Sequence, residues 1–264
     1  RPAMRDCTPP GMDVLPVALD DSGDPAKARR AAQKLLVDPN VRAIVGPLLL
    51  ESVPAVATVI TAGVAMPWYA PPVVLPAGGF GDPMSGEWLA AQVAYIAENA
   101  PADRVLLVGL PADWQIEVIT TVPVTRIDDL SSAHNALLTA SGEKVAALWL
   151  GSPAQGAQWL TTLQAVSPTV NFWLADQAGI AIFAAHLAAQ PAVDGANRNQ
   201  SHWLIWSDSQ YNQRSSDETT IQPSAAARDL TYRATCAALQ NLDKATPSPA
   251  SAWELHSRPI DLTK

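Results

Sequence analysis

The sequence lacks the short motifs that mark most nucleotide-binding and hydrolytic enzymes. It contains no Gly-x-Gly-x-x-Gly, no Gly-x-x-x-x-Gly-Lys-Ser/Thr and no Gly-x-Ser-x-Gly pattern. Its four histidines, His134, His186, His202 and His256, are scattered without metal-ligand spacing. These absences favour binding without turnover, so we expect a non-enzyme that needs neither a metal nor a cofactor.

Clusters of positive charge and long apolar runs are also missing. The formal net charge is −8, and no run of Lys and Arg interrupts the acidic balance. This argues against nucleic acid or an anionic membrane surface as the main partner. No apolar run is long enough to cross a bilayer, and no signal peptide precedes Arg1. A mature or trimmed secreted form is compatible with both observations.

Cysteine is scarce as well, with Cys7 and Cys236 as the two examples. In an oxidising compartment they could form one long-range disulfide. The other interpretation is two unrelated thiols, one near the N-terminus and one on a helix. The sequence leaves both open.

What the sequence does contain is a repeated α/β pattern, clearest over residues 13–62. The apolar run 13–19 predicts a buried strand. Asp24 and Pro25 then provide an N-cap and a first helical position. A helix with alanines and leucines on one face follows, then a strand over 41–45, a turn at Gly46 and a helix over 52–62. Strand, helix and strand in this order predict parallel pairing.

A second α/β alternation begins near residue 101. We expect helices over 85–97, 131–140, 153–166, 180–189 and 225–242, and strands over 104–110, 116–125, 145–150, 171–175 and 203–206. Residues 1–12 indicate an irregular lead-in. Only residues 111–115 separate two of the strands, which is too short for a crossover helix.

Ligands of an open parallel sheet bind beyond the carboxyl ends of its strands. The candidate ligand-binding residues at those ends are Leu50, Glu51, Ser52, Trp68, Tyr69, Ala70, Trp114, Ser152, Asp176 and Trp206. The mixture of aromatic, hydroxyl and carboxylate groups suits a small polar or zwitterionic organic ligand.

Most of these residues also have a structural interpretation. Ser52 and Asp176 could each be a helix N-cap instead of a ligand contact. The two aromatic residues Trp68 and Tyr69 could pack on the lobe surface, and Trp114 and Trp206 could belong to the core or rim. Glu51 could simply be solvated.

Several segments resemble one known family. They are Asp20 to Pro25 with the helix that follows, Val41-Arg-Ala-Ile-Val-Gly-Pro-Leu48, Ser52-Val-Pro-Ala-Val-Ala57 and Ala62-Gly-Val-Ala-Met66. Together they resemble the amino-terminal lobe of type I periplasmic binding proteins. More narrowly, they are similar to the branched-chain amino acid (Leu/Ile/Val) solute-binding proteins of ABC transporters, also called extracellular ligand-binding receptors.

The resemblance implies an α/β fold of two Rossmann-like lobes with parallel sheets, closing on a ligand like a hinged trap. It places 1–100 and 208–245 in lobe 1, and 101–207 and 246–264 in lobe 2. It also implies that residues 50–52 and 68–71 hold the α-carboxylate of an amino acid, and that Asp176 meets its ammonium group.

The implied protein is a periplasmic or extracellular monomer, with a lipid anchor to the cell surface as an option. Its partners would be a small amino-acid-like ligand and an ABC transporter permease. The alternative is a ligand-sensing or regulatory domain of the same fold that signals to a partner protein. This chain has Leu50 and Glu51 where the family usually has Ser or Thr, and Trp68 and Tyr69 favour a flat or bulky apolar ligand group.

Overall fold

A computed structural model describes most of the chain. The described residues are 2–60, 66–71, 73, 86–100, 102–111, 114, 116–140, 142–176, 179–190, 201–208, 223–242 and 253–259, with the backbone alone for 205–208, 223–227, 229 and 253–259. The chain divides into two compact units. Unit 1 comprises Arg1–Ser85 and Ser207–Glu254, and unit 2 comprises Gly86–Trp206 and Leu255–Lys264.

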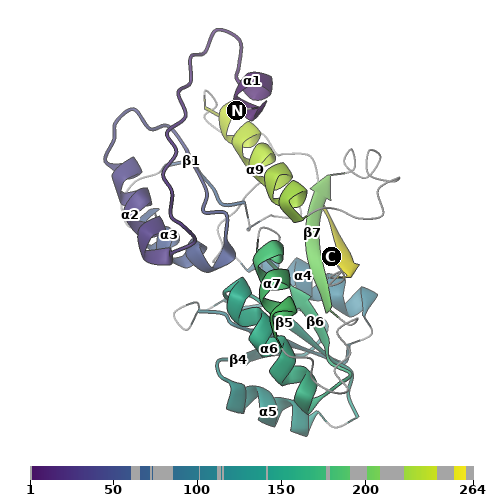
Figure 1. Ribbon diagram of the computed structural model, residues 1–264. Coiled ribbons are helices and arrows are strands. Elements are labelled where there is room, and N and C mark those ends of the chain that lie inside the picture. Colours follow the sequence, from purple (N-terminus) through teal and green to yellow (C-terminus); the bar gives the residue numbers. More distant parts are fainter. Residues whose placement is uncertain are drawn as a thin grey trace. The chain divides into compact units, whose positions relative to one another are not determined.

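Unit 1 consists of helices around a small parallel sheet. Its helical elements are α1 (Pro2–Cys7), α2 (Pro25–Leu36), the 3-10 turn η1 (Leu50–Ser52), α3 (Val53–Ile60) and α9 (Pro223–Gln240). Strand β1 (Ile44–Val45) pairs in parallel with β2 (Trp68–Tyr69). Helices α2 and α3 cover one side of the two strands and α9 covers the other (Figure 1).

Helix α2 begins where the sequence predicts. The Asp24 carboxylate accepts hydrogen bonds from the amides of Ala26 and Lys27, at 2.8 and 3.0 Å, and Pro25 occupies the first helical position. Ala28 and Ala32 are buried against α3 and β1. The expected cap and apolar face are therefore both confirmed.

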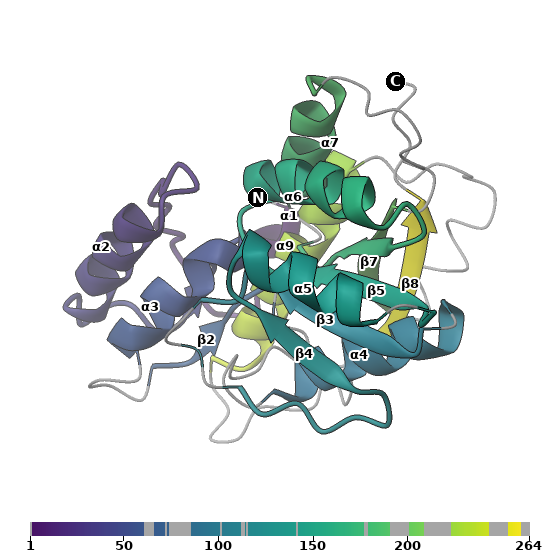
Figure 2. The same ribbon diagram turned by 90° about the horizontal axis from the view of Figure 1, so that it is seen from below.

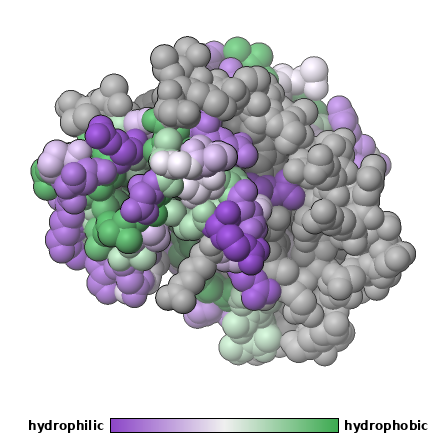
Figure 3. Space-filling view, turned by 90° about the horizontal axis from the view of Figure 1, so that it is seen from above, coloured by the Kyte–Doolittle hydropathy of each residue, from purple (hydrophilic) through white to green (hydrophobic). Residues whose placement is uncertain are grey.

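The strand predicted over residues 13–19 is wrong. The structure assigns no strand there, and Leu15, Val17 and Leu19 are exposed. The described part of unit 1 offers this segment no neighbouring strand, so its alternating apolar side chains have no sheet face to cover. The space-filling view in Figure 3 shows hydrophobic residues at the surface beside hydrophilic ones.

Unit 2 is built on a six-stranded sheet in the order β4-β3-β5-β6-β7-β8. The strands are β3 (Arg104–Val108), β4 (Val124–Ile127), β5 (Val145–Trp149), β6 (Asn171–Leu174), β7 (Ser201–Asp208) and β8 (Trp253–Pro259). All pairs from β4 to β7 are parallel. Helices α5 (Leu130–Thr139), α6 (Pro153–Val166) and α7 (Ile180–Ala188) cover one face, and α4 (Glu87–Asn99) covers the other (Figure 2).

Aromatic side chains fill both faces of this sheet. Phe172 stacks on Phe183 of α7, with ring centroids 5.7 Å apart. The next residue, Trp173, points to the opposite face, where it meets Tyr95 of α4 edge-on at 6.4 Å and stacks on His202 of β7 at 4.6 Å. This alternation explains why the strands of unit 2 read as continuous apolar runs.

The expected lobe boundary near residue 101 stays a prediction. The compact units differ from it in that Gly86 is the first residue of unit 2, where α4 packs through Tyr95 and Trp88. Two other predictions about organisation need correction. The strand predicted over 116–125 is only Val124–Ile127, and residues 116–120 precede it without regular structure. The lead-in contains α1, and β8 was not predicted. The remaining helices of unit 2 lie within about two residues of their predicted bounds.

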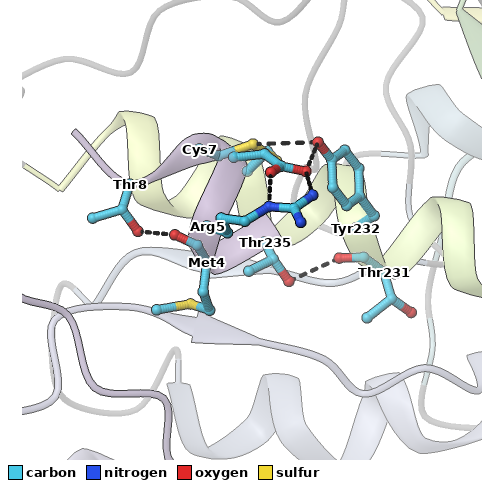
Figure 4. Close-up of a disulfide and its surroundings, with 9 residues drawn as sticks. Met4, Arg5, Cys7, Thr8, Thr231, Tyr232 and Thr235 are labelled. Atoms are coloured by element: carbon cyan, nitrogen blue, oxygen red, sulfur yellow. Dashed lines mark hydrogen bonds and ion pairs between the residues drawn. A yellow bond between two sulfur atoms is a disulfide. The ribbon is translucent and has the colours of Figure 1, made fainter. Parts of the chain in front are cut away.

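The two cysteines form a disulfide, which settles the alternative that the sequence left open. Cys7 at the end of α1 is bonded to Cys236 in α9, with Cα atoms 5.1 Å apart. Beside the bond, the Tyr232 hydroxyl donates to Asp6 at 3.5 Å (Figure 4). Cys236 is buried, so the disulfide fastens the N-terminal helix to the inner part of α9.

Candidate functional site

The carboxyl end of β1 leads into the turn that carries Leu50, Glu51 and Ser52. These residues form η1, whose N-cap is Leu49, and α3 continues directly from it. Leu50 and Ser52 are buried, and Glu51 is half-buried. The interpretation of Ser52 as a helix N-cap is wrong, because Ser52 lies inside the helical stretch that begins after Leu49, and its Oγ accepts no cap bond.

Ser52 combines complete burial with an unused hydroxyl. Its exposed fraction is 0%, and its Oγ has no hydrogen-bond partner in the structure. Polar atoms of Gln92, Trp173 and Ser201 are also buried without a partner, but they lie within α4, β6 and β7. Ser52 differs from them in standing where a strand end meets a helix start, which is the usual place of a ligand in an α/β fold.

The aromatic pair on β2 points to opposite sides of the small sheet. Trp68 packs with the cluster of α2 and α3, and its indole Nε1 donates to the Gly46 carbonyl at 2.6 Å. Tyr69 packs against Ala234 and Ala238 of α9. Burial raises the pKa of the Tyr69 hydroxyl, and a hydrogen bond with Asn241 acts in the opposite direction. The described contacts of both rings are therefore with their own unit. Ala70, the next residue, is fully buried.

The candidate residues of unit 2 follow β3, β5 and β6. Trp114 is buried and meets Trp88 of α4 edge-on at 6.4 Å. Ser152 precedes α6 without a side-chain cap bond, and its carbonyl accepts from Trp149 Nε1 at 2.9 Å. Trp206 lies in β7, and its side chain falls outside the described part.

Asp176 follows β6 and is 1% exposed. Its Oδ1 accepts a hydrogen bond from the amide of Gly179 at 3.0 Å, and the main chain closes the same turn at 3.2 Å. Gly179, not Asp176, is the N-cap of α7. The carboxylate thus shapes the turn before the helix, and the N-cap interpretation of Asp176 is wrong.

Arg126 is a residue at this edge of unit 2 that the sequence reasoning missed. It lies on β4, opposite Leu107 of β3. Its guanidinium donates to the carbonyls of Leu110, Pro111 and Trp114, and its Nε donates to Asp128. A lone arginine near the end of an otherwise uncharged strand is the signal that could have indicated it.

Nothing in the described part of the chain suggests a metal centre or a membrane span. No group of three or more His, Cys, Asp and Glu side chains there could hold a metal ion. Burial lowers the pKa of His202, the imidazole stacked on Trp173. No helix among the described residues has the length and apolar character needed to cross a bilayer.

A surface pocket of about 410 Å³ lies elsewhere in unit 2. It is lined by Leu130, Ser131, Ala133, His134 and Asn135 of α5 and by Thr162, Leu163 and Val166 of α6. No candidate residue lines it, and it lies on the helices that cover the sheet instead of at the strand ends. We therefore keep it separate from the candidate site.

The two parallel α/β units have the fold of type I periplasmic binding proteins, as a comparison with solved structures shows. The leucine-binding protein LivK of Thermotoga maritima shares this fold, with a TM-score of 0.54 and 16% identity over 92% of this chain and 75% of that one. No protein-family profile and no curated protein matches the sequence.

Two further solved structures are similar over much of the chain. One is an ABC transporter substrate-binding protein of Desulfitobacterium hafniense in complex with Leu, at 15% identity, 90% and 75% coverage and a TM-score of 0.49. The other is an extracellular ligand-binding receptor of Rhodopseudomonas palustris, at 14% identity, 95% and 84% coverage and a TM-score of 0.48.

Proposed function

We propose that this chain is the solute-binding protein of an ABC importer, that it captures a small amino-acid-like or aromatic organic ligand, and that it does so without turnover. Its fold is shared with a leucine-binding protein, which supports this class of function. The proposed location is periplasmic or extracellular, and the proposed protein partner is a transporter permease. No observation favours the alternative of a sensor domain.

The observation that carries the proposal is the unpartnered hydroxyl of Ser52. A buried hydroxyl without a partner costs about 1–3 kcal/mol, so a fold retains one when something else satisfies it. The amides at the start of a helix favour a negative group through their partial positive charge. A ligand carboxylate at the start of α3 would accept a hydrogen bond from Ser52 Oγ and would also lie near this partial positive charge.

Asp176 is proposed as the counter-charge for a ligand ammonium group. It is a buried carboxylate at the carboxyl end of β6, and its Oδ1 accepts a hydrogen bond from the Gly179 amide. Leu50, which is buried, replaces a hydroxyl with an apolar contact and favours a ligand with an apolar side chain.

The test is a thermal-shift screen against amino acids, short amides, aromatic acids and sugars, followed by calorimetric titration of any ligand that stabilises the protein. We expect stabilisation by one chemical class, with leucine as the first compound to examine. Ser52→Ala should weaken binding about tenfold, which corresponds to the loss of one hydrogen bond to a charged group. Ser132→Ala, at an exposed position in the first turn of α5, is the matched control. Equal affinities of the two variants would contradict the role of Ser52.

A further inference from the structure

The connection between β3 and β4 is unusual for two parallel neighbours. Such strands need a crossover of a dozen or more residues, which is commonly a helix. Here the connection runs from 109 to 123, and its described residues contain no helix. The described carbonyl groups of this connection lie outside regular secondary structure, so buried ones need a donor from elsewhere in the chain.

Arg126 supplies these donors. Its Nη1 donates to the Trp114 carbonyl at 2.6 Å, and its Nη2 donates to the carbonyls of Pro111 at 2.6 Å and Leu110 at 3.2 Å. The Trp114 amide donates in turn to the Pro111 carbonyl at 2.9 Å, and this bond joins the two residues in a turn. One guanidinium thus bonds both ends of the turn that follows β3.

Asp128 holds the guanidinium in this orientation by accepting from its Nε at 2.8 Å. The side chain of Arg126 is 26% exposed, so its bonds are only partly screened by water. Hydrogen bonds from a charged donor are about twice as strong as neutral ones. The planar fork of arginine reaches several acceptors at once, whereas lysine offers a single point charge.

We propose that Arg126 is a positioning residue of the ligand site: it fixes Pro111 and Trp114 in this turn at the carboxyl edge of unit 2 and thereby places Trp114 for ligand recognition. This inference rests on the proposed binding function. The turn seats the Trp114 ring against Trp88 of α4, so the guanidinium and the indole contact hold it from two directions. If the turn is displaced, the Trp114 side chain moves within the proposed ligand site while the sheet stays folded.

The test compares Arg126→Ala with Arg104→Ala in the full chain. Arg104 is a matched control because it lies at the amino end of β3, the strand next to β4, and bonds Glu143 at 2.9 Å and Thr125 at 3.3 Å instead of the carbonyls that follow β3. Both variants remove one positive charge. Amide exchange of Trp114 by NMR reports the turn, and calorimetric titration with leucine reports binding. Arg126→Lys keeps the charge and serves where Arg126→Ala does not fold.

We expect Arg126→Ala to speed Trp114 exchange and weaken leucine binding, each about tenfold, and Arg126→Lys to be intermediate. Arg104→Ala should change neither. Faster exchange with unchanged leucine affinity would overturn the role in recognition, and unchanged exchange would overturn the clamp itself. If the wild-type chain binds neither leucine nor any compound of the screen, the proposed function fails and the recognition role fails with it, while exchange still decides whether Arg126 holds the turn.

Discussion

Replacing Ser52 with alanine should stabilise the ligand-free protein, although most substitutions of buried residues destabilise. The Ser52 hydroxyl is fully buried and has no hydrogen-bond partner in the structure. Folding therefore removes it from water without compensation. Alanine keeps the Cβ and removes the oxygen. The folded state of the variant therefore no longer contains an unsatisfied buried hydroxyl, and it loses no hydrogen bond.

The size of the effect follows from two opposing contributions. An unsatisfied buried hydroxyl costs about 1–3 kcal/mol. Removing one atom from a packed site leaves a small void, which cancels part of this gain. We expect a net increase of about 1 kcal/mol in the free energy of unfolding, equivalent to roughly 2–4 °C in melting temperature for a chain near this size.

The same variant should lose part of its response to ligand. At a hundredfold excess over the dissociation constant, the wild-type chain gains about 2.7 kcal/mol by mass action. With tenfold weaker affinity, the variant gains about 1.4 kcal/mol at the same ligand concentration. Urea unfolding with and without ligand measures both quantities. A ligand-free variant that is less stable than wild type would refute the reasoning, because Ser52 Oγ would then be making a bond that the fold needs.

Three other expectations concern the fold. Reducing the Cys7–Cys236 disulfide, which spans 229 residues, should lower the free energy of unfolding by about 5 kcal/mol, measured by urea titration with and without reductant. Gly109→Ala should destabilise more than Gly142→Ala, since both have positive φ but only at Gly109 would a Cβ lie 2.8 Å from a backbone nitrogen; equal melting temperatures would contradict this. Two amide hydrogen bonds hold the pKa of Asp24 below its ordinary value, so its stabilisation is complete above about pH 4 and disappears as pH falls through the folded-state pKa. Melting curves of Asp24→Ala and wild type should therefore converge in acid.

Local signals predicted the helices well because each carries its own information. Asp24 and Pro25 determine the start of α2 through bonds within three residues of sequence. The apolar spacing of Trp88, Leu89 and Val93 likewise places the buried face of α4. Local sequence patterns do not show which other strand a segment pairs with. Residues 13–19 have the composition of a strand, yet no strand pairs with them in the described part of unit 1.

The candidate site was predictable in position more than in detail. Strand ends follow from chain order, so the turns that carry Ser52, Ser152 and Asp176 could be found from sequence. Whether a side chain is satisfied depends on contacts that sequence does not give. Trp114 packs on Trp88, far back in the chain, and Arg126 reaches carbonyls up to sixteen residues away. The N-cap assignments of Ser52 and Asp176 failed because neighbouring residues take that position.

The disulfide also gives the molecule a covalent topology that its fold does not require. The chain leaves unit 1 after Ser85 and returns to it at Ser207, and Cys7 and Cys236 join unit 1 on either side of this excursion. All of unit 2 up to Trp206 is therefore carried inside one closed covalent ring. A protease that cuts once anywhere within the ring opens it without releasing a fragment, so the nicked protein runs as a single species until a reductant is added.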